Sequence, residues 1–539
     1  MLKKIRFYLS LLRVLIARNR KKISYSFIGL LLVIFAIRIL LPLAIPKVAE
    51  AYKEFKKPSF VEGVVGKPTH PNPLSDITET QKDISSLVFR GLTKLGKDGK
   101  LVPDLAESFK QTSDTEYVFN LRKDVYWQDN VKFTSDDVLY TVKLTQNPNF
   151  NSPVSNNFKD VLIEKIDDYK VKFKLKEAFA PFPYTTTIGI IPSHVPLKKY
   201  RPVGTGPFSV KKITKDQVVL TNDKFNLVFK FYKTISDAKT ALKLGEIHAL
   251  GGLSPQELGS IKNFGGENFY ESPLPYREAV IFFNVRGNPL KTKEIRQALS
   301  YALNKEAIWK AAGGTTSVIS QNELPLLSPI NEKKERYPFN LDRAKELLEN
   351  NKYKFEKDTW KKDGREFTLK ITSIDDPELN SIVNLVKDSW SNLGLKVKTE
   401  FVDVNALRSV ILPNRNFQVL VNFQDISSDP DQYVLWHTTQ VQAANITGIS
   451  SPKLDKILED TRKSTDEKFR AERYKLFTTL LLDEEPAIFL YYPTYTWVVS
   501  KKVFGIDFKD FSIPSDRFNS INKWQIKSGL FDIIFPERR

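Results

Sequence analysis

A short acidic segment near residue 430 holds the side chains best suited to bind a charged ligand. Asp425 and Asp429 lie between Phe423 and Tyr433, directly after an apolar stretch. A carboxylate just beyond a strand end, among aromatic side chains, is well placed to meet a ligand cation. The alternative is a solvated turn in which the aspartates cap the backbone, because Asp-Pro sequences favour turns. The residue types alone leave both possibilities open.

Motifs for catalysis and metal binding are weak. Ser236 and Lys239 match the Ser-x-x-Lys spacing of serine acyl-enzymes, but the spacing recurs elsewhere and no Lys-Thr-Gly partner exists. The chain has no Gly-x-Ser-x-Gly, His-Glu-x-x-His or P-loop motif. It has no cysteine and only four histidines, which are far apart. We therefore expect no enzyme, no metal site and no cofactor.

A pair of glycines, Gly204 and Gly206, flanks Thr205. The segment lacks the third glycine of a dinucleotide-binding loop. We expect Gly204 and Gly206 to serve a hinge or the entry to a strand instead.

The patterning between these segments predicts a mixed α/β protein with several sheets. Residues 117–121 and 170–176 alternate between apolar and polar side chains, which indicates half-buried strands. Residues 279–284 form a continuous apolar run, which is typical of a central strand. Thr134 and Asp137 have the form of a helix capping box. A last long helix is expected over about 453–484, stopped by Pro486.

The N-terminus predicts a membrane anchor. Residues 1–22 carry eight basic and no acidic side chains, and 23–45 is an apolar stretch whose single charge is Arg38. About 20 apolar residues span a bilayer, and the positive-inside rule places residues 1–22 in the cytoplasm. The small residues of 49–51 leave signal-peptidase cleavage open. The length of the apolar stretch favours an uncleaved anchor, followed by a linker over 46–59.

The positive charge does not indicate nucleic-acid binding. The chain carries net +19, of which residues 1–57 contribute +11 and the other 482 residues +8. Most of the excess therefore lies beside the predicted membrane segment, where it determines topology.

Several segments together resemble the family 5 extracellular solute-binding proteins, the dipeptide- and oligopeptide-binding subunits of ABC importers. They occur in the family's order over about residues 62–508. They are Pro103–Phe109 with Tyr117–Val125 and Phe133–Val138, Val203–Phe208, Phe283–Arg286 with Ile295–Ala302, Asp429–Asp431, and Pro486–Tyr492. Asn130 and Ser135 replace the family's usual Gly and Ala. The usual lipoprotein cysteine is also missing, and the apolar helix at 23–45 fits as its substitute.

The resemblance implies a two-lobed, periplasmic-binding-protein-like α/β fold of type II with an extra α/β subdomain, here preceded by one transmembrane helix. Its implied organisation places lobe I in three segments, the subdomain inside that lobe, and lobe II in one continuous segment. The boundaries are 60–92, 200–275 and 497–539 for lobe I, 93–199 for the subdomain and 276–496 for lobe II.

The implied function is capture of a peptide between closing lobes and its delivery to ABC permease subunits. By resemblance, Asp425 matches the aspartate that pairs with a peptide's α-ammonium, with Phe423, Asp429 and Tyr433 beside it. The implied protein is a monomer at the cell membrane, with its ectodomain extracellular or periplasmic. Two alternatives stay open: a surface receptor that uses the same fold without transport, and a surface hydrolase.

Overall fold

The computed structural model describes residues 57–526, apart from 97, 196–201, 263–264, 315 and 510. The chain divides into two compact units, Met1–Ser59 and Phe60–Arg539, and the fold below is that of the second. The predicted basic segment, transmembrane anchor and cleavage motif lie within 1–56, outside the described residues. In the part that is described, no helix combines the length and the apolar character needed to cross a bilayer.

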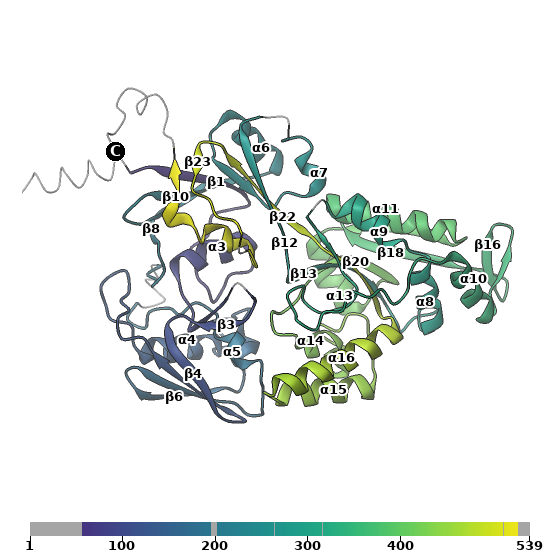
Figure 1. Ribbon diagram of the computed structural model, residues 1–539, viewed down its shortest axis with the longest axis horizontal. Helices are drawn as coiled ribbons and strands as arrows, with labels where there is room; N and C mark the ends of the chain where they lie inside the picture. Colours follow the sequence, from purple (N-terminus) through teal and green to yellow (C-terminus); the bar gives the residue numbers. More distant parts are fainter. Residues whose placement is uncertain are drawn as a thin grey trace, which may run out of the picture. The chain divides into compact units, whose positions relative to one another are not determined.

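A seven-stranded sheet joins the two ends of the described chain. Its strand order is β12-β22-β11-β1-β10-β9-β8. β1 pairs in parallel with β11, and the long β22 pairs antiparallel with both β11 and β12 (Figure 1). The strands are β1 (Ser59–Val65), β8 (Ser209–Ile213), β9 (Gln217–Thr221), β10 (Asn226–Tyr232), β11 (Ala249–Gly251), β12 (Glu267–Pro273) and β22 (Thr494–Ser500).

A six-stranded sheet forms the second large layer, in the order β14-β21-β13-β20-β18-β19. Its strands are β13 (Arg277–Phe283), β14 (Val318–Ile319), β18 (Thr368–Ile374), β19 (Lys396–Val402), β20 (Val419–Asp425) and β21 (Ala487–Tyr492). Helices α9 (Lys305–Ala312) and α11 (Pro377–Asn392) lie on one face, and α15 (Pro452–Lys463) and α16 (Glu467–Glu484) on the other (Figure 1).

This double coverage confirms the prediction of a central strand at 279–284. Ile281 and Phe283 of β13 pack into the core that contains Trp390 of α11. Val280 and Phe282 point to the opposite core, which contains Leu481 of α16. Because alternate residues of a strand point to opposite faces, a strand with helices on both faces is apolar throughout.

A four-stranded antiparallel sheet, β4-β5-β7-β6, forms a separate layer with its own core. Both alternating segments of the sequence are strands in it, and Phe119 and Phe173 are buried as predicted. Helix α4 (Ser135–Thr145) packs on this sheet, and the backbone N–H of Thr134 donates to Asp137 Oδ2 at 3.0 Å, as the capping pattern predicted. The strands are β4 (Ala106–Ser113), β5 (Glu116–Leu121), β6 (Leu162–Asp167) and β7 (Lys170–Lys174).

Shorter elements complete the described fold. The small strands are β2 (Thr93–Leu95), β3 (Leu101–Pro103), β15 (Lys354–Glu356), β16 (Thr359–Lys362), β17 (Arg365–Glu366), β23 (Val503–Phe504) and β24 (Gln525–Ile526). The other helices are α3 (Glu79–Val88), α5 (Phe182–Thr185), α6 (Ile235–Leu244), α7 (Pro255–Leu258), α8 (Lys293–Tyr301), α10 (Leu341–Asn350), α12 (Val404–Ala406), α13 (Leu412–Asn414) and α14 (Tyr433–Trp436).

The prediction of one long helix over 453–484 is wrong. The segment forms two helices, α15 and α16, separated at 464–466. Ser464 is extended, and the carboxylate of Asp466 accepts hydrogen bonds from the backbone N–H groups of Lys468 and Phe469. Ser and Asp offer the backbone such local partners, and this favours a new helix start over continuation.

Two short connections carry the chain between the large sheets. One runs from β12 to β13 and the other from β21 to β22. They are bonded to each other, because the backbone N–H of Leu274 donates to the carbonyl of Pro493 at 2.8 Å. The predicted boundary between residues 496 and 497 falls inside β22. The domain boundaries otherwise stay a prediction.

Gly204 and Gly206 lie where the chain returns from the four-stranded to the seven-stranded region. Gly206 N–H donates to the carbonyl of Val88 at 2.8 Å. The backbone N–H of Gln128 donates to the carbonyl of Gly204 at 3.0 Å. The backbone N–H of Gly204 donates in turn to Gln128 Oε1, also at 3.0 Å. A Cβ at Gly204 would collide with the carbonyl oxygen of Val88. The position thus needs a glycine for close approach of two backbones.

We expect Gly204→Ala to lower the free energy of unfolding by about 3 kcal/mol, the upper end for overpacking, because the obstacle is backbone. Denaturant unfolding of the purified chain measures it. Gly287→Ala is the matched control, since a Cβ there meets nothing within 4 Å. Equal stability of the two variants would contradict a packing role for Gly204.

Candidate functional site

A cavity of about 400 Å³ lies between the two large sheets. Cavities of this size are typical of small-ligand sites. We call it the central cavity. The seven-stranded side contributes Glu62–Val65, Glu79, Thr80, Asp83, Ile235, Leu250–Ser254, Glu257, Tyr495, Pro514 and Arg517 to its wall. The six-stranded side and the two connections contribute Leu274, Arg277, Asp376, Glu378, Phe423 and Pro493, and the first residue of β22, Thr494, completes the wall.

One wall contains a buried ion triad. Arg517 Nε lies 3.0 Å from Glu62 Oε1, and a terminal nitrogen of the same guanidinium lies 2.7 Å from Asp83 Oδ2. Burial raises the pKa of Glu62, and Arg517 opposes that shift. Burial likewise disfavours the charged guanidinium, but Asp83 and Glu62 more than compensate, so the pKa of Arg517 is raised. The two carboxylates therefore hold the guanidinium of Arg517 in its charged form.

The opposite wall carries a second cation, Arg277. It faces Asp425 across the β13–β20 pair, in direct register, with Nε 2.8 Å from Asp425 Oδ1. A terminal nitrogen also lies 3.5 Å from Glu79 Oε1, which belongs to the seven-stranded side. Arg277 and Glu79 thus form an ion pair across the central cavity.

The predicted ligand residues Asp425 and Phe423 have different positions. Phe423 contributes to the cavity wall. Asp425 ends β20 beyond the lining residues, and its side chain is 67% exposed and bound to Arg277. A ligand ammonium at Asp425 would have to share this carboxylate with the guanidinium.

The predicted residues Asp429 and Tyr433 take part in a different cluster. Asp429 Oδ1 lies 2.6 Å from a terminal nitrogen of Arg470, and Asp429 is almost fully buried. The guanidinium of Arg462 lies over the rings of Tyr433, at 4.2 Å, and Phe179, at 4.6 Å. Neither Asp429 nor Tyr433 is among the described residues that line the central cavity. The cluster instead joins the six-stranded region to the segment after the four-stranded sheet.

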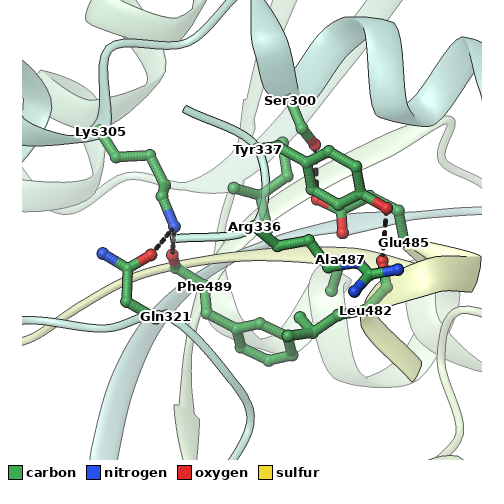
Figure 2. Close-up of a pocket in the computed structure, with 10 residues that line it drawn as sticks. Ser300, Lys305, Gln321, Arg336, Tyr337, Leu482, Glu485, Ala487 and Phe489 are labelled. Atoms are coloured by element: carbon green, nitrogen blue, oxygen red, sulfur yellow. Dashed lines mark hydrogen bonds between the residues drawn. The ribbon is translucent and has the colours of Figure 1, made fainter. Parts of the chain in front are cut away.

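A second, much smaller cavity lies beside β21 and α8 (Figure 2). Lys305 Nζ donates there to Gln321 Oε1 at 2.7 Å, and Ser300 donates to Glu485 (Figure 2). Burial raises the pKa of Glu485 to about 8. The volume of about 20 Å³ has room for one water, so this cavity cannot hold a peptide.

The residues of the remaining sequence motifs do not come together in one site. Ser236 is exposed in the first turn of α6. His194 contacts Asp129 at 2.9 Å, and His248 accepts a hydrogen bond from Val61 N–H at 3.0 Å, so each has a local structural partner. In the part of the chain that is described, no group of His, Cys, Asp and Glu side chains could hold a metal ion.

Sequence reasoning missed five charged residues of the central cavity. They are Arg277, Arg517, Glu62, Glu79 and Glu378. Each is a single charged residue in or beside a strand or helix, and its partner lies far along the chain. The charge at Glu62 inside the otherwise apolar strand β1 was the one available signal, because a buried charge requires a partner.

Comparison with known proteins gives one consistent result. Residues 100–445 match the family described as bacterial extracellular solute-binding proteins, family 5. The oligopeptide-binding protein AppA of Bacillus subtilis is 26% identical over 502 residues, which cover 86% of this chain and 91% of that protein.

Two solved structures have the same fold. The ABC transporter substrate-binding protein CtaP of Listeria monocytogenes superposes with a TM-score of 0.77 at 25% identity, covering 88% of this chain and all of that one. NikZ of Campylobacter jejuni, in complex with Ni(L-His), gives 0.73 at 25% identity, covering 87% of this chain and 99% of that one. The two-lobed α/β fold predicted from the sequence is confirmed.

The Asp429–Arg470 pair predicts a stability effect. Asp429→Asn leaves the buried guanidinium without its anion, so we expect a loss of about 3–5 kcal/mol in the free energy of unfolding. Asp342→Asn is the control, because its side chain is 98% exposed. Denaturant unfolding of both variants tests this. Unchanged stability with lost ligand binding would show instead that Asp429 contacts the ligand.

Proposed function

Since the chain belongs to the bacterial extracellular solute-binding proteins of family 5, we propose that it binds peptides in the central cavity and delivers them to an ABC permease. A relative that aligns over most of both chains is an oligopeptide-binding protein. We further propose that residues 23–45 anchor the protein in the cell membrane, with residues 1–22 in the cytoplasm and the chain after residue 46 outside. The basic residues before that stretch and the missing lipoprotein cysteine support the anchor.

The central cavity is the observation that carries this proposal. Its walls come from two sheets that are joined by two adjacent connections, so a small rotation about 274–276 and 493 would open or close it. A bound ligand would contact both walls at once and stabilise the closed state. This is how binding can become a signal that a permease recognises.

The charges in the wall and directly beside it suit a peptide, which carries both an ammonium and a carboxylate. Arg277, Asp425 and Glu79 provide both signs of charge within one cluster. We propose that the ligand's α-ammonium joins this cluster at Asp425, beside Phe423. Because Arg277 already neutralises Asp425, the ammonium would add to an existing pair and would not fill an empty site. We propose that the ligand is bound and released without chemical change.

Identification of the natural ligand tests the proposal. The full chain, purified in mild detergent and then denatured, should release peptides that mass spectrometry detects. The same preparation from cells without the protein is the control for carry-over. Release of a metal chelate or a sugar, with no peptide, would contradict the assignment.

The role of Asp425 predicts a difference between free and blocked peptides. We expect Asp425→Asn to weaken binding of a co-purified peptide by about 2 kcal/mol, the low end for one side of a charge pair, because this carboxylate is largely exposed and shared with Arg277. The N-acetylated peptide should bind the unchanged protein correspondingly weakly. Calorimetry with both peptide forms measures this, and Asp342→Asn again serves as control. Equal affinities throughout would show that Asp425 is not the anchor.

The proposed anchor predicts a topology. Protease added to intact cells should digest the region after residue 46 while the protein stays with the membrane fraction. A cytoplasmic protein probed in the same cells is the control for lysis. A mature protein free in the medium and starting at Tyr52 would show cleavage instead.

A further inference from the structure

The wall of the central cavity carries an excess of negative charge. Six carboxylates line it, against two guanidiniums. They belong to Glu62, Glu79, Asp83, Glu257, Asp376 and Glu378. The excess contrasts with the net charge of +19 on the whole chain. The site therefore differs in charge from the molecule that contains it.

The two guanidiniums do not balance this excess. Arg517 is engaged by Glu62 and Asp83 in the buried triad. Arg277 contacts Asp425 directly and reaches Glu79 at 3.5 Å. Each cation thus already faces two carboxylates. In the described part of the chain, no ion pair joins a lysine or arginine to Asp376, Glu378 or Glu257.

The three unpaired carboxylates differ in how their oxygens are used. Glu257 caps α7 and accepts from the N–H and hydroxyl of Ser254. Asp376 caps α11 through Oδ1, which accepts from the backbone N–H groups of Glu378 and Leu379. Of the three carboxylates, Glu378 therefore has the fewest partners for its negative charge.

Glu378 is 5% exposed, although it carries a charge when ionised. Its Oε1 accepts a hydrogen bond from the hydroxyl of Tyr491 at 2.8 Å. Among the described residues, nothing donates to its Oε2. This oxygen is not enclosed by protein, so a cation in the central cavity could contact it directly and pair with the charge of the carboxylate.

We propose that the central cavity selects peptides that carry a lysine or arginine side chain, and that Glu378, supported by Asp376, receives the cation. The proposal rests on the proposed function and specifies its ligand class. The α-ammonium and the side-chain cation then occupy different places, Asp425 and the N-terminus of α11.

Binding of such a peptide would depend on pH. Burial, with a smaller contribution from the neighbouring Asp376, raises the pKa of Glu378 to about 7, although the hydrogen bond from Tyr491 and the charge of Arg277 oppose the shift. The groups that face Glu378 are Tyr491 from β21, Arg277 from β13 and Glu257 from α7 across the cavity. A cation favours the ionised carboxylate. Affinity for a basic peptide should therefore rise with pH through 7, and binding below that pH should release a proton.

The test compares three tripeptides that differ only in the central side chain: Ala-Lys-Ala, Ala-Met-Ala and Ala-Glu-Ala, with the five-residue homologues alongside. Calorimetry with the full chain should show Ala-Lys-Ala binding about 30-fold or more tighter than Ala-Met-Ala, the low end for a buried charge pair. Ala-Glu-Ala should bind most weakly. Titrations of Ala-Lys-Ala in buffers of different ionisation enthalpy should reveal the released proton.

Glu378→Gln should remove most of the preference for Ala-Lys-Ala while leaving Ala-Met-Ala bound within a few-fold. Asp376→Asn keeps the helix cap, since Asn caps as well as Asp, and should reduce the preference less. Glu306→Gln, on the exposed side of α9, is the control for loss of one negative charge.

The outcomes separate the two proposals. Peptides that bind with equal affinity whatever their central side chain would overturn the charge selection and leave the peptide-binding function intact. A preference that persists in Glu378→Gln would overturn the role of Glu378. If no peptide binds, the proposed function fails, and the charge selection fails with it. The tripeptide and pH series with the unchanged chain tests the charge selection even if a variant does not fold.

Discussion

A guanidinium that is 2% exposed and far from solvent must find anions, and this constraint on Arg517 organises one side of the protein. Its two carboxylates, Glu62 and Asp83, come from β1 and α3, and Glu62 is 455 residues away in sequence. A buried cation left without them would cost about 3–5 kcal/mol. The triad therefore ties β1 and α3 to a segment near the other end of the described chain. The same contacts fix one wall of the central cavity, because all three side chains line it.

The opposite wall depends on the six-stranded sheet in a different way. There the charged residues occupy the ends of strands and helices, and Arg277 at the start of β13 is held by its cross-strand partner. The interior of the same strand is apolar on both faces, so the sheet is rigid where it is buried and charged where it meets the cavity. The two walls contact each other through single pairs such as Arg277 and Glu79. Single pairs of this kind are weak in the presence of solvent, which suits the opening proposed for the central cavity.

The sequence allowed prediction of whatever depends on local patterning. Strands at 117–121 and 170–176, the central strand at 279–284 and the cap at Thr134 follow from side-chain periodicity and from short-range hydrogen bonds. The break between α15 and α16 was missed because apolar spacing alone continues across it, whereas the capping carboxylate of Asp466 decides the structure. Asp425 could be recognised as a carboxylate at a strand end, but its pairing with Arg277 could not. That pair joins residues 148 positions apart and depends on the register of two strands, which no local pattern encodes.

Net charge is a poor guide to what such a protein binds. The basic residues of the N-terminal segment and the scattered surface lysines act through water and salt, where charges more than about 8–10 Å apart are largely screened. The carboxylates of the central cavity lie in the wall that a ligand would contact, so at this short range each has a larger effect on a ligand than a distant surface lysine does. A chain of net +19 can therefore present a negative interior to its ligand. Under the proposed function the two charge distributions serve separate ends, because the basic N-terminal segment would adjoin the membrane and the carboxylates of the central cavity would meet the solute. The two charge distributions can thus vary independently without changing the fold that holds both.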